Sequence, residues 1–377
     1  MKKSFILCVF LPFLFAVNIQ AQSFSITNAL LDTNTISLSW DNVTNRYIIS
    51  QSTSLITGQW EYVGIVLSTN DSVITNIYDN CFYRIRKVKV VNFADTNFEQ
   101  AVRNAITNKF IPTNLVYDID VNTMTNLDVS SKSITNALGI EEFITLTNLW
   151  CYNNQLTNLS VSACANLSSL SCYGNLLTNL DVSGCSNLLI ISCNNNNLTD
   201  LNLSSNNRLT YLSCAFNSLT NLDVSTCSNL QHLACHWNDL SNLNVSACVN
   251  LSELYCYWNH ITNLNLNYNL KLSLLNCYEN QLSNLDVSAN ICLTNLNCSY
   301  NDLTTIDVSA NTNLQYLNCT FNTFLTNLDI SANSNLTYVD ARTCLVLTNI
   351  TVWYPATNIP SGLTLLYNGI TTLSYQP

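Results

Sequence analysis

The segment CHWNDLSNLNVSACVNLSELYCYWNH, residues 235–260, fits either a metal site or one unit of a repeat. Its three cysteines and final histidine follow the order C-x12-C-x7-C-x3-H, which is similar to the ligand spacing of some zinc sites. Its first and third cysteines also share one phase of a 21-residue period, and each is followed three positions later by asparagine. The sequence on either side of the segment decides between the two interpretations.

The 21-residue spacing continues far beyond this segment. Nine cysteines are spaced at this interval. Each has leucine or isoleucine two positions before it and asparagine three positions after it. These cysteines are Cys151, Cys172, Cys193, Cys214, Cys235, Cys256, Cys277, Cys298 and Cys319. The unit is L-x-x-L-x-C-x-x-N-x-L-T-N-L-D-V-S-x-C/N-x-N. A fixed period of about 20 to 50 residues indicates a stacked-repeat architecture.

The unit predicts a short strand and a compact return. Alternation in L-x-C directs leucine and cysteine to the same face of a strand. A 21-residue unit is too short for a strand, two turns and a long helix, so we expect an extended or 3-10 return. Stacking then buries columns of Leu, Cys and Val, and the asparagine turns inward to bind backbone groups at the bend. About ten coils at ~4.8 Å each give a solenoid on the order of 50 Å long.

This pattern is similar to that of leucine-rich repeats, with cysteine in place of the third leucine. The chain resembles the secreted leucine-rich-repeat proteins of Gram-negative bacteria and, more distantly, internalin-type surface proteins. DTNFEQAVRNAI (95–106) resembles the N-terminal cap of that family, and MTNLDVSSKSITNALGIEEFITLTNL (124–149) resembles its first, longer repeat. The resemblance implies a mainly β solenoid with a parallel concave sheet and a short cap helix, and a role in adhesion. The cap sequence independently predicts a helix with Thr96 and Glu99 as its capping box.

The repeat explains the cysteines of the quoted segment. Cys235 and Cys256 belong to one buried ladder, and Cys248 belongs to a second ladder in which Cys and Asn exchange. The second ladder consists of Cys164, Cys185, Asn206, Cys227, Cys248, Asn269 and Asn290. Exchange with asparagine favours a small turn-facing position over a metal ligand. Side chains in register point in parallel, which favours free buried thiols over disulfides. Cys81 and Cys292 lie outside both ladders, and their redox state stays open.

The N-terminus predicts export. Residues 1–21 have the basic start, the short apolar run and the terminal small residue of a signal peptide. No later apolar segment approaches the ~18 residues that a membrane-spanning helix needs, so we expect no membrane insertion. Without the two signal lysines, 11 basic residues oppose 23 acidic ones, and this balance argues against nucleic acid and anionic membrane surfaces as partners. Export leaves the periplasm, the cell surface and the medium open.

The other segments complete the predicted domain organisation. Residues 22–90 contain four predicted strands, 35–40, 46–53, 59–66 and 81–88, and resemble a small β-sandwich of the fibronectin type III kind. Its expected core residues are Trp40, Tyr47, Trp60 and Phe82. Residues 91–123 are expected to cap the solenoid, 124–350 to form 21- or 22-residue repeats, and 351–377 to form the C-terminal cap.

Candidate binding residues lie on the strand face that is opposite the buried Leu and Cys, which we expect to be the concave side, and two positions after the cysteine, where the turn begins at one rim. They are Trp150, Tyr152, Tyr173, Tyr211, Phe216, His232, His236, Trp237, Tyr255, Tyr257, Trp258 and Tyr278. Phe216, Trp237 and Trp258 occupy one column in three successive coils, which predicts a contiguous aromatic ridge. Two interpretations stand: aromatic contacts that stabilise the sheet, or a recognition patch for a protein or carbohydrate partner.

Catalysis and metal binding find less support. His232 and His236 are expected roughly 13 Å apart on one strand face, too far for joint metal ligation. The column of Asp286, Asp307 and Asp329 has the oxygen ligands that Ca²⁺ prefers, although such side chains more often bind local backbone N–H groups. We expect no cofactor. The favoured hypothesis is an exported, non-enzymatic binding or adhesion protein; the alternative is a structural spacer of an envelope or matrix without a specific ligand.

Overall fold

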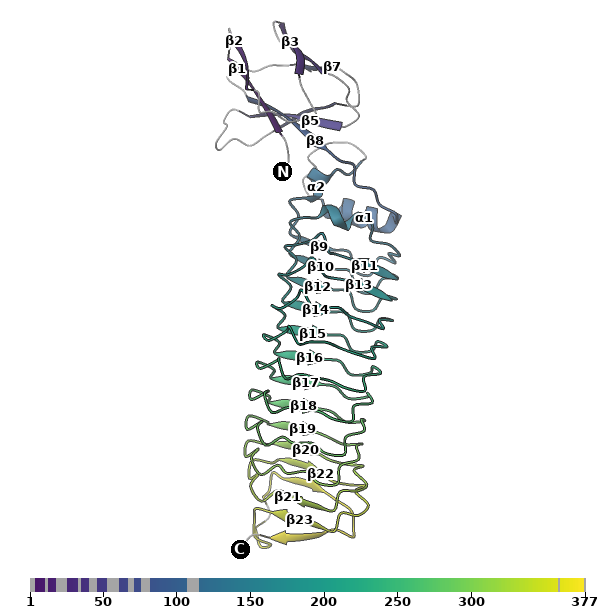
Figure 1. Ribbon diagram of the computed structural model, residues 1–377, viewed down its shortest axis with the longest axis vertical. Coiled ribbons are helices and arrows are strands. Elements are labelled where there is room, and N and C mark those ends of the chain that lie inside the picture. Colours follow the sequence, from purple (N-terminus) through teal and green to yellow (C-terminus); the bar gives the residue numbers. More distant parts are fainter. Residues whose placement is uncertain are drawn as a thin grey trace. The chain divides into compact units, whose positions relative to one another are not determined.

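The computed structural model describes residues 88–106, 115–358 and 360–375 with their side chains, and before residue 88 it describes eight strands by their backbone alone. The chain divides into two compact units, Met1–Asn92 with Arg103–Met124, and Phe93–Val102 with Thr125–Pro377. Figure 1 labels their elements.

The first unit contains two antiparallel sheets, ordered β2-β1-β8-β5-β6 and β3-β4-β7. Its strands are β1 (Ser4–Phe10), β2 (Phe13–Val17), β3 (Ile26–Asp32), β4 (Thr35–Trp40), β5 (Arg46–Ser52), β6 (Glu61–Val66), β7 (Asp71–Thr75) and β8 (Phe82–Val88). The four strands expected from the sequence occur as β4, β5, β6 and β8. Three features predicted from the sequence lie outside the described residues: the core side chains of the sandwich, Cys81 and the cleavage region of the signal peptide. The sandwich and the signal peptide therefore stay predictions. The unit also contains the short helix α2 (Asp118–Val121).

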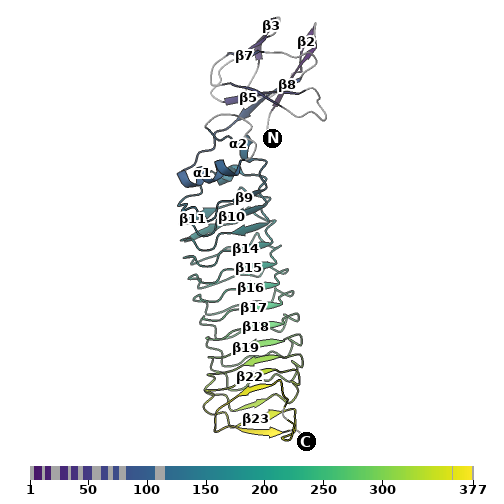
Figure 2. The same cartoon turned by 180° about the vertical axis from the view of Figure 1, so that it is seen from behind.

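The second unit is a solenoid whose coils each add one strand to a 12-stranded parallel sheet (Figures 1 and 2). Its strands are β9 (Asn126–Asp128), β10 (Asn148–Trp150), β12 (Ser169–Ser171), β14 (Ile190–Ser192), β15 (Tyr211–Ser213), β16 (His232–Ala234), β17 (Glu253–Tyr255), β18 (Leu274–Asn276), β19 (Asn295–Asn297), β20 (Tyr316–Asn318), β22 (Tyr338–Asp340) and β24 (Thr364–Leu366). The return side carries two short parallel sheets: β11 (Asn158–Ser160) with β13 (Asn179–Asp181), and β21 (Asn327–Asp329) with β23 (Asn349–Val352) and β25 (Thr372–Tyr375). A 3-10 turn, η1 (Ile140–Glu142), lies in the first, longer repeat.

The register of the sheet aligns each repeat with the next. Leu233 on β16 is paired with Leu212 on one side and Leu254 on the other, and all three are fully buried. The alternation predicted for L-x-C is therefore confirmed: leucine and cysteine point into the coil, and the residues between and beside them form the outer face. Continuous columns of Leu, Cys and Val make the core, as expected for a stack whose coils cannot enclose a core alone.

The cysteine ladder consists of free, buried thiols. Its nine side chains are at most 2% exposed, and none of the described cysteines forms a disulfide. Burial raises the pKa of Cys151, Cys193 and Cys235 to about 12, because a thiolate in this interior would lose its hydration. The thiols therefore act as small apolar core residues.

The asparagine ladder joins neighbouring coils. In one representative coil, the Asn238 Oδ1 accepts a hydrogen bond from the Leu219 backbone N–H at 2.9 Å. Its Nδ2 donates to the backbone carbonyls of Cys214 and Cys235, both at 3.1 Å. The same bonds recur in other coils, at Asn175, Asn196, Asn259 and Asn301. Each amide satisfies backbone groups at the bend that the sheet leaves unpaired, which confirms the inward orientation predicted from the sequence.

The second ladder explains why Cys and Asn exchange there. Asn269 Nδ2 donates to the carbonyls of Val245 at 3.0 Å and Cys248 at 2.9 Å, and the Cys248 thiol donates to the carbonyl of Val224 at 3.7 Å. The position requires a donor that reaches the preceding coils, and both side chains supply one. The Asn269 Oδ1 has no hydrogen-bond partner, a defect that a thiol at the same position avoids.

Helix α1 (Thr96–Ala105) packs at the beginning of the stack, with Phe98, Ala101 and Val102 buried. The predicted capping box of Thr96 and Glu99 is wrong. Asp95 Oδ1 accepts hydrogen bonds from the backbone N–H groups of Asn97 at 2.8 Å and Phe98 at 2.9 Å, so the N-cap lies one residue earlier. Its other oxygen accepts hydrogen bonds from the N–H and the hydroxyl of Thr135, which ties the helix to the first repeat.

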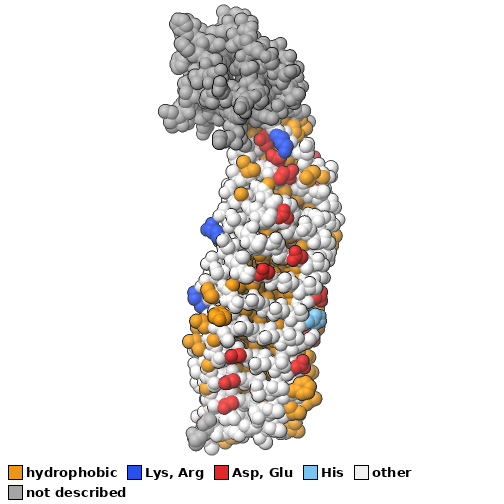
Figure 3. Space-filling model, viewed as in Figure 1, with side chains coloured by type: hydrophobic (Ala, Val, Ile, Leu, Met, Phe, Trp, Pro, Cys, Tyr) orange, Lys and Arg blue, Asp and Glu red, His pale blue; other side chains and the backbone are white. Residues whose placement is uncertain are grey.

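The solenoid surface in the view of Figure 3 is mostly uncharged, with scattered acidic side chains and few basic ones. Among the described residues, no helix has the length and the apolar character to cross a membrane.

Candidate functional site

The outer face of the 12-stranded sheet presents three columns of side chains in each coil. In the coil of Cys235 these are His232, Ala234 and His236, and the following turn presents Trp237. The twelve residues predicted as a binding surface all belong to these columns or to the turn column. They fall into several stacks instead of one patch.

Two stacks lie over the sheet itself. One consists of His236, Tyr257 and Tyr278, with ring centroids 4.2 Å and 4.6 Å apart. Another joins Tyr211 to His232 at 4.4 Å. Further along the chain toward the N-terminus, Tyr152 and Tyr173 form a separate pair at 4.7 Å. These contacts are the cross-strand ring pairs that stabilise sheets, so this part of the predicted surface also serves the fold.

The turn column contains the predicted aromatic ridge. Phe216 and Trp237 stack at 5.5 Å, and Trp237 and Trp258 stack at 4.3 Å with their planes 10° apart. Tyr300 and Phe321 continue the same column after one interruption and stack at 4.0 Å. These five rings are between 39% and 44% exposed. They therefore present a large apolar surface that the fold does not cover.

The backbone of this column is left-handed in each coil from Ser131 to Thr343. Trp237 and Trp258 both have φ of 53°, the same value as Asn153 earlier in the column and close to the 65° of Gly174. Asn and Gly adopt this conformation readily, whereas for a bulky side chain it is an outlier that costs roughly 1–2 kcal/mol. The aromatic residues thus occupy positions where the backbone favours small ones. Strained residues of this kind point to a functional role more than to a structural one.

A hollow of about 470 Å³ lies beside the ridge, and the residues that line it come from four coils. Trp237, Trp258 and Glu279 of the turn column line it, together with Asp239, His260 and Gln281. Four members of the asparagine ladder complete the lining: Asn217, Asn238, Asn259 and Asn280. His260 Nε2 lies 3.8 Å from Asp239 Oδ1, and both side chains are more than half exposed. The hollow therefore combines indole rings with carboxylate, imidazole and amide groups.

The two sheet-face histidines differ in environment. His232 Nδ1 lies 2.9 Å from Glu253 Oε2, and Tyr255 donates to the same oxygen at 3.3 Å. Glu253 lies one repeat of 21 residues after His232 and comes from the next coil, so the 21-residue offset is the signal in the sequence that indicates this pairing. His236 has a buried Nδ1 without a hydrogen-bond partner, and burial together with the nearby His232 lowers its pKa to about 4. Neither arrangement resembles a nucleophile with its base.

The carboxylate column predicted as a calcium candidate has a local role. Asp286, Asp307 and Asp329 each accept a hydrogen bond at 2.9 Å from the backbone N–H two residues later. Such bonds fix turns. Within the described part of the chain, no group of three or more His, Cys, Asp or Glu side chains is placed to hold a metal ion.

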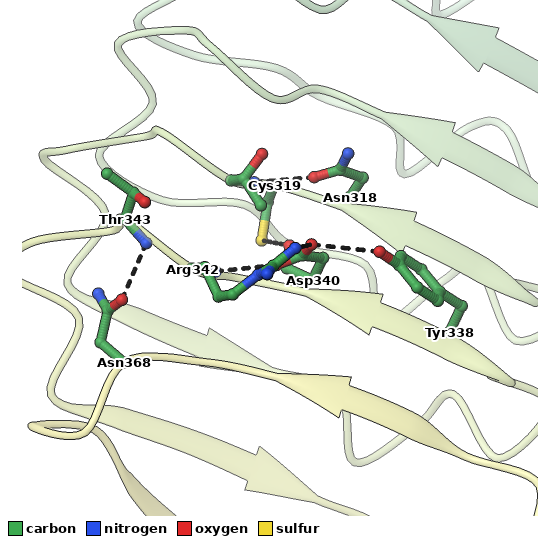
Figure 4. A network of polar contacts seen from close by, with 8 residues as sticks. Asn318, Cys319, Tyr338, Asp340, Arg342, Thr343 and Asn368 are labelled. Carbon is green, nitrogen blue, oxygen red and sulfur yellow. Dashed lines mark hydrogen bonds and ion pairs between the residues drawn. The ribbon is translucent and has the colours of Figure 1, made fainter.

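A charged cluster lies on the C-terminal part of the sheet face (Figure 4). Arg342 donates from Nε to Asp340 Oδ1 at 2.9 Å and from Nη2 to Oδ2 at 2.6 Å, and Tyr338 adds a hydrogen bond at 3.2 Å. Burial alone would raise the pKa of Asp340, but the hydrogen bonds and charge of Arg342 outweigh it, and the pKa is lowered. In the next turn, Thr343 N–H donates to Asn368 Oδ1 at 2.9 Å, so this asparagine repeats the inter-coil bond of the ladder.

Three solved structures illustrate what the chain is similar to. The functional domain of InlJ from Listeria monocytogenes, which includes a cysteine ladder, is 32% identical over 76% of this chain and 72% of that chain, with a TM-score of 0.55. The leucine-rich-repeat domain of APL1B is 21% identical over 60% and 76%, with a TM-score of 0.50. The internalin InlF from L. monocytogenes is 19% identical over 74% and 92%, with a TM-score of 0.44. No protein-family model and no curated protein sequence matches the chain.

Proposed function

Because the chain belongs to the internalin-type leucine-rich-repeat proteins, with a cysteine ladder like that of InlJ, we propose that it is a non-enzymatic binding protein that engages a protein or carbohydrate partner through its exposed aromatic residues. The signal-peptide pattern supports export, to the cell surface, the surrounding medium or the periplasm. In this function the solenoid holds the aromatic ridge rigidly.

The observation that carries the proposal is the strained, exposed ridge. Trp237 and Trp258 each keep about 40% of their surface exposed on a left-handed backbone that Asn or Gly would adopt without strain. A column selected only for stability would keep the Asn and Gly of the earlier coils. Tyr and Trp are instead the residues that contribute most at recognition surfaces, since they bury large areas at little entropic cost.

The alternative is a structural spacer without a specific ligand. The stacks of the sheet face favour it to the extent that their ring contacts stabilise neighbouring strands. The two functions differ in what they require of the ridge. A spacer requires the ridge only for folding, whereas a receptor requires it for binding.

The test is a screen of the purified protein against a glycan array and a panel of immobilised extracellular-matrix proteins. The double variant Trp237→Ala/Trp258→Ala is screened beside it, and Tyr268→Ala serves as the control because Tyr268 is 59% exposed on the return side of the solenoid. We expect a ligand that the native protein and the control bind and the double variant does not, with unchanged melting. The absence of any ligand, with a markedly lower melting temperature of the double variant, would support the spacer.

A further inference from the structure

The aromatic ridge has one interruption, and it is a carboxylate. Along the turn column the order is Phe216, Trp237, Trp258, Glu279, Tyr300, Phe321, one residue per coil. Glu279 has φ of 52° like its neighbours, so the backbone continues unchanged through the gap. Only the side chain differs, and an acidic group takes the place of a ring.

Two rings bound the gap, Trp258 and Tyr300, and among the described residues each stacks with a partner on one side only. Trp258 is covered by Trp237 on its other side, and Tyr300 is covered by Phe321 on its other side. Strands in a sheet are about 4.8 Å apart, so rings two coils apart are separated by roughly 9.6 Å. A planar group in van der Waals contact with both rings requires about 7–8 Å. The separation exceeds this by about 2 Å, so the space between Trp258 and Tyr300 admits one planar layer that stacks on one ring and faces the other, provided that the Glu279 carboxylate stays at its edge.

The charged side chain in the gap is a carboxylate without a partner in the described part of the chain. Among the described residues, no side-chain hydrogen bond or ion pair holds Glu279, which is half-buried. It also lines the same hollow as Asp239, and none of the ten residues that line this hollow is Lys or Arg. The whole chain has a net charge of −10. An unpaired carboxylate between aromatic faces in an acidic protein is complementary to a cation.

We propose that Trp258, Glu279 and Tyr300 form a receptor for a guanidinium group, presented by an arginine on a basic segment of a protein partner. A guanidinium is planar, stacks on aromatic faces and pairs with a carboxylate through two parallel hydrogen bonds. A lysine ammonium satisfies the charge but cannot fill the layer between two rings. The hollow beside the gap receives the rest of the segment, with Asp239 as a second acidic contact. This site rests on the proposed binding function and specifies its partner as a basic protein.

The test uses tetra-arginine amide as the probe, with tetra-citrulline amide as its neutral isostere and tetra-lysine amide as its non-planar counterpart. Binding is measured by tryptophan fluorescence and calorimetry at low salt. The variant Glu279→Gln removes the charge and keeps the side-chain size. The control Asp200→Asn makes the same change in net charge about four coils away, at an exposed side chain. Melting temperatures confirm that both variants fold.

We expect the arginine probe to bind more tightly than the lysine probe and the citrulline probe not to bind. Glu279→Gln should weaken the arginine probe by at least about tenfold, and Asp200→Asn should leave it within about twofold. Equal binding of arginine and citrulline probes, or equal loss in both variants, would overturn the site. A glycan ligand from the screen above that Glu279→Gln still binds, with no arginine binding, would overturn this inference and leave the proposed function standing.

Discussion

Trp237 and Trp258 occupy the same position in successive coils, and their rings stack 4.3 Å apart on backbones that share a left-handed φ of 53°. The contact and the strain oppose each other energetically. A ring pair of this kind contributes about 0.5–1.5 kcal/mol, whereas the backbone conformation costs roughly 1–2 kcal/mol per residue. For the two residues the strain amounts to about 2–4 kcal/mol and exceeds the contribution of the contact, so the ridge adds no net stability to the solenoid.

Trp237→Asn should therefore change the free energy of unfolding by less than about 1.5 kcal/mol, because Asn relieves the strain while the stacking is lost. Leu233→Ala, in the same coil but fully buried, should lose about 2–5 kcal/mol. Chemical denaturation of both variants gives the comparison. Equal destabilisation would mean that the ridge is architectural.

Asn238→Ala should destabilise the protein by about 1–3 kcal/mol, because it leaves the Leu219 N–H without a partner. It also removes one of the two hydrogen bonds to the carbonyls of Cys214 and Cys235, which keep those from Asn217 and Asn259. The control is Asn250→Ala, whose exposed amide donates one hydrogen bond, to the carbonyl of Ser228. Urea denaturation measures both. If the two variants lost the same amount, the inter-coil bonding assigned to the ladder would be incorrect.

His236 should make stability depend on pH. Its pKa is lowered to about 4 in the folded protein, against an ordinary value of 6.5. Below pH 6.5 this histidine is protonated in the unfolded chain but stays neutral in the folded protein. The free energy of unfolding therefore falls as the pH decreases from 6.5 toward 4, by up to about 1.4 kcal/mol per pH unit. His236→Phe keeps a ring against Tyr257 and should remove this slope. Denaturation at pH 7 and pH 5 tests it, and an unchanged slope in the variant would contradict the assignment.

Arg342→Ala should lower the stability of the C-terminal coils, because Asp340, with a side chain 4% exposed, would remain as a buried carboxylate without its cation. The pKa of Asp340 is lowered, so the stabilisation is present at neutral pH and disappears as the pH falls through that lowered pKa. Arg208→Ala removes an exposed arginine that bonds Asn187 and is the matched control. Thermal melting at pH 7 should separate the two variants.

Cys292 should react with iodoacetamide in the folded protein while the ladder cysteines stay protected. It is exposed, whereas the Cys235 thiol is fully buried with its pKa raised to about 12, and the thiolate is the reactive form. Peptide mapping by mass spectrometry after brief labelling, with and without denaturant, shows the difference. Labelling of Cys235 at the rate of Cys292 without denaturant would disprove a closed interior.

The period of the sequence was sufficient to predict the stacked coils, the buried Leu and Cys columns and the inward asparagines, because each depends on alternation and spacing alone. The helix cap at Asp95 was misplaced by one residue, since Asp and Thr both cap helices and only the backbone geometry decides between them. The pairing of His232 with Glu253 joins two coils and depends on side-chain rotamers.

The strain in the ridge was also not predicted, although a signal for it existed. Asn153, Gly174 and Asn195 precede Phe216 in the turn column, and Asn and Gly are the residues that favour a left-handed backbone. The period of the sequence shows which residues share a column. Asn and Gly in that column indicate a left-handed backbone, whereas the aromatic residues of the same column do not. For a related reason, the sequence does not single out Glu279. Its position matters only because Trp258 and Tyr300, the rings on either side of it, stack with other partners.

The asparagine ladder has a consequence for how such a gene can change. Each amide binds only its own coil and the neighbouring one, with the same bonds at each step. A recombination event that duplicates or deletes one in-register unit therefore creates two junctions of the kind already present, and it leaves no backbone group newly unpaired. The number of coils is free to drift over generations while each coil keeps its stability. The ridge can then be lengthened, or moved relative to the cap helix, one coil at a time.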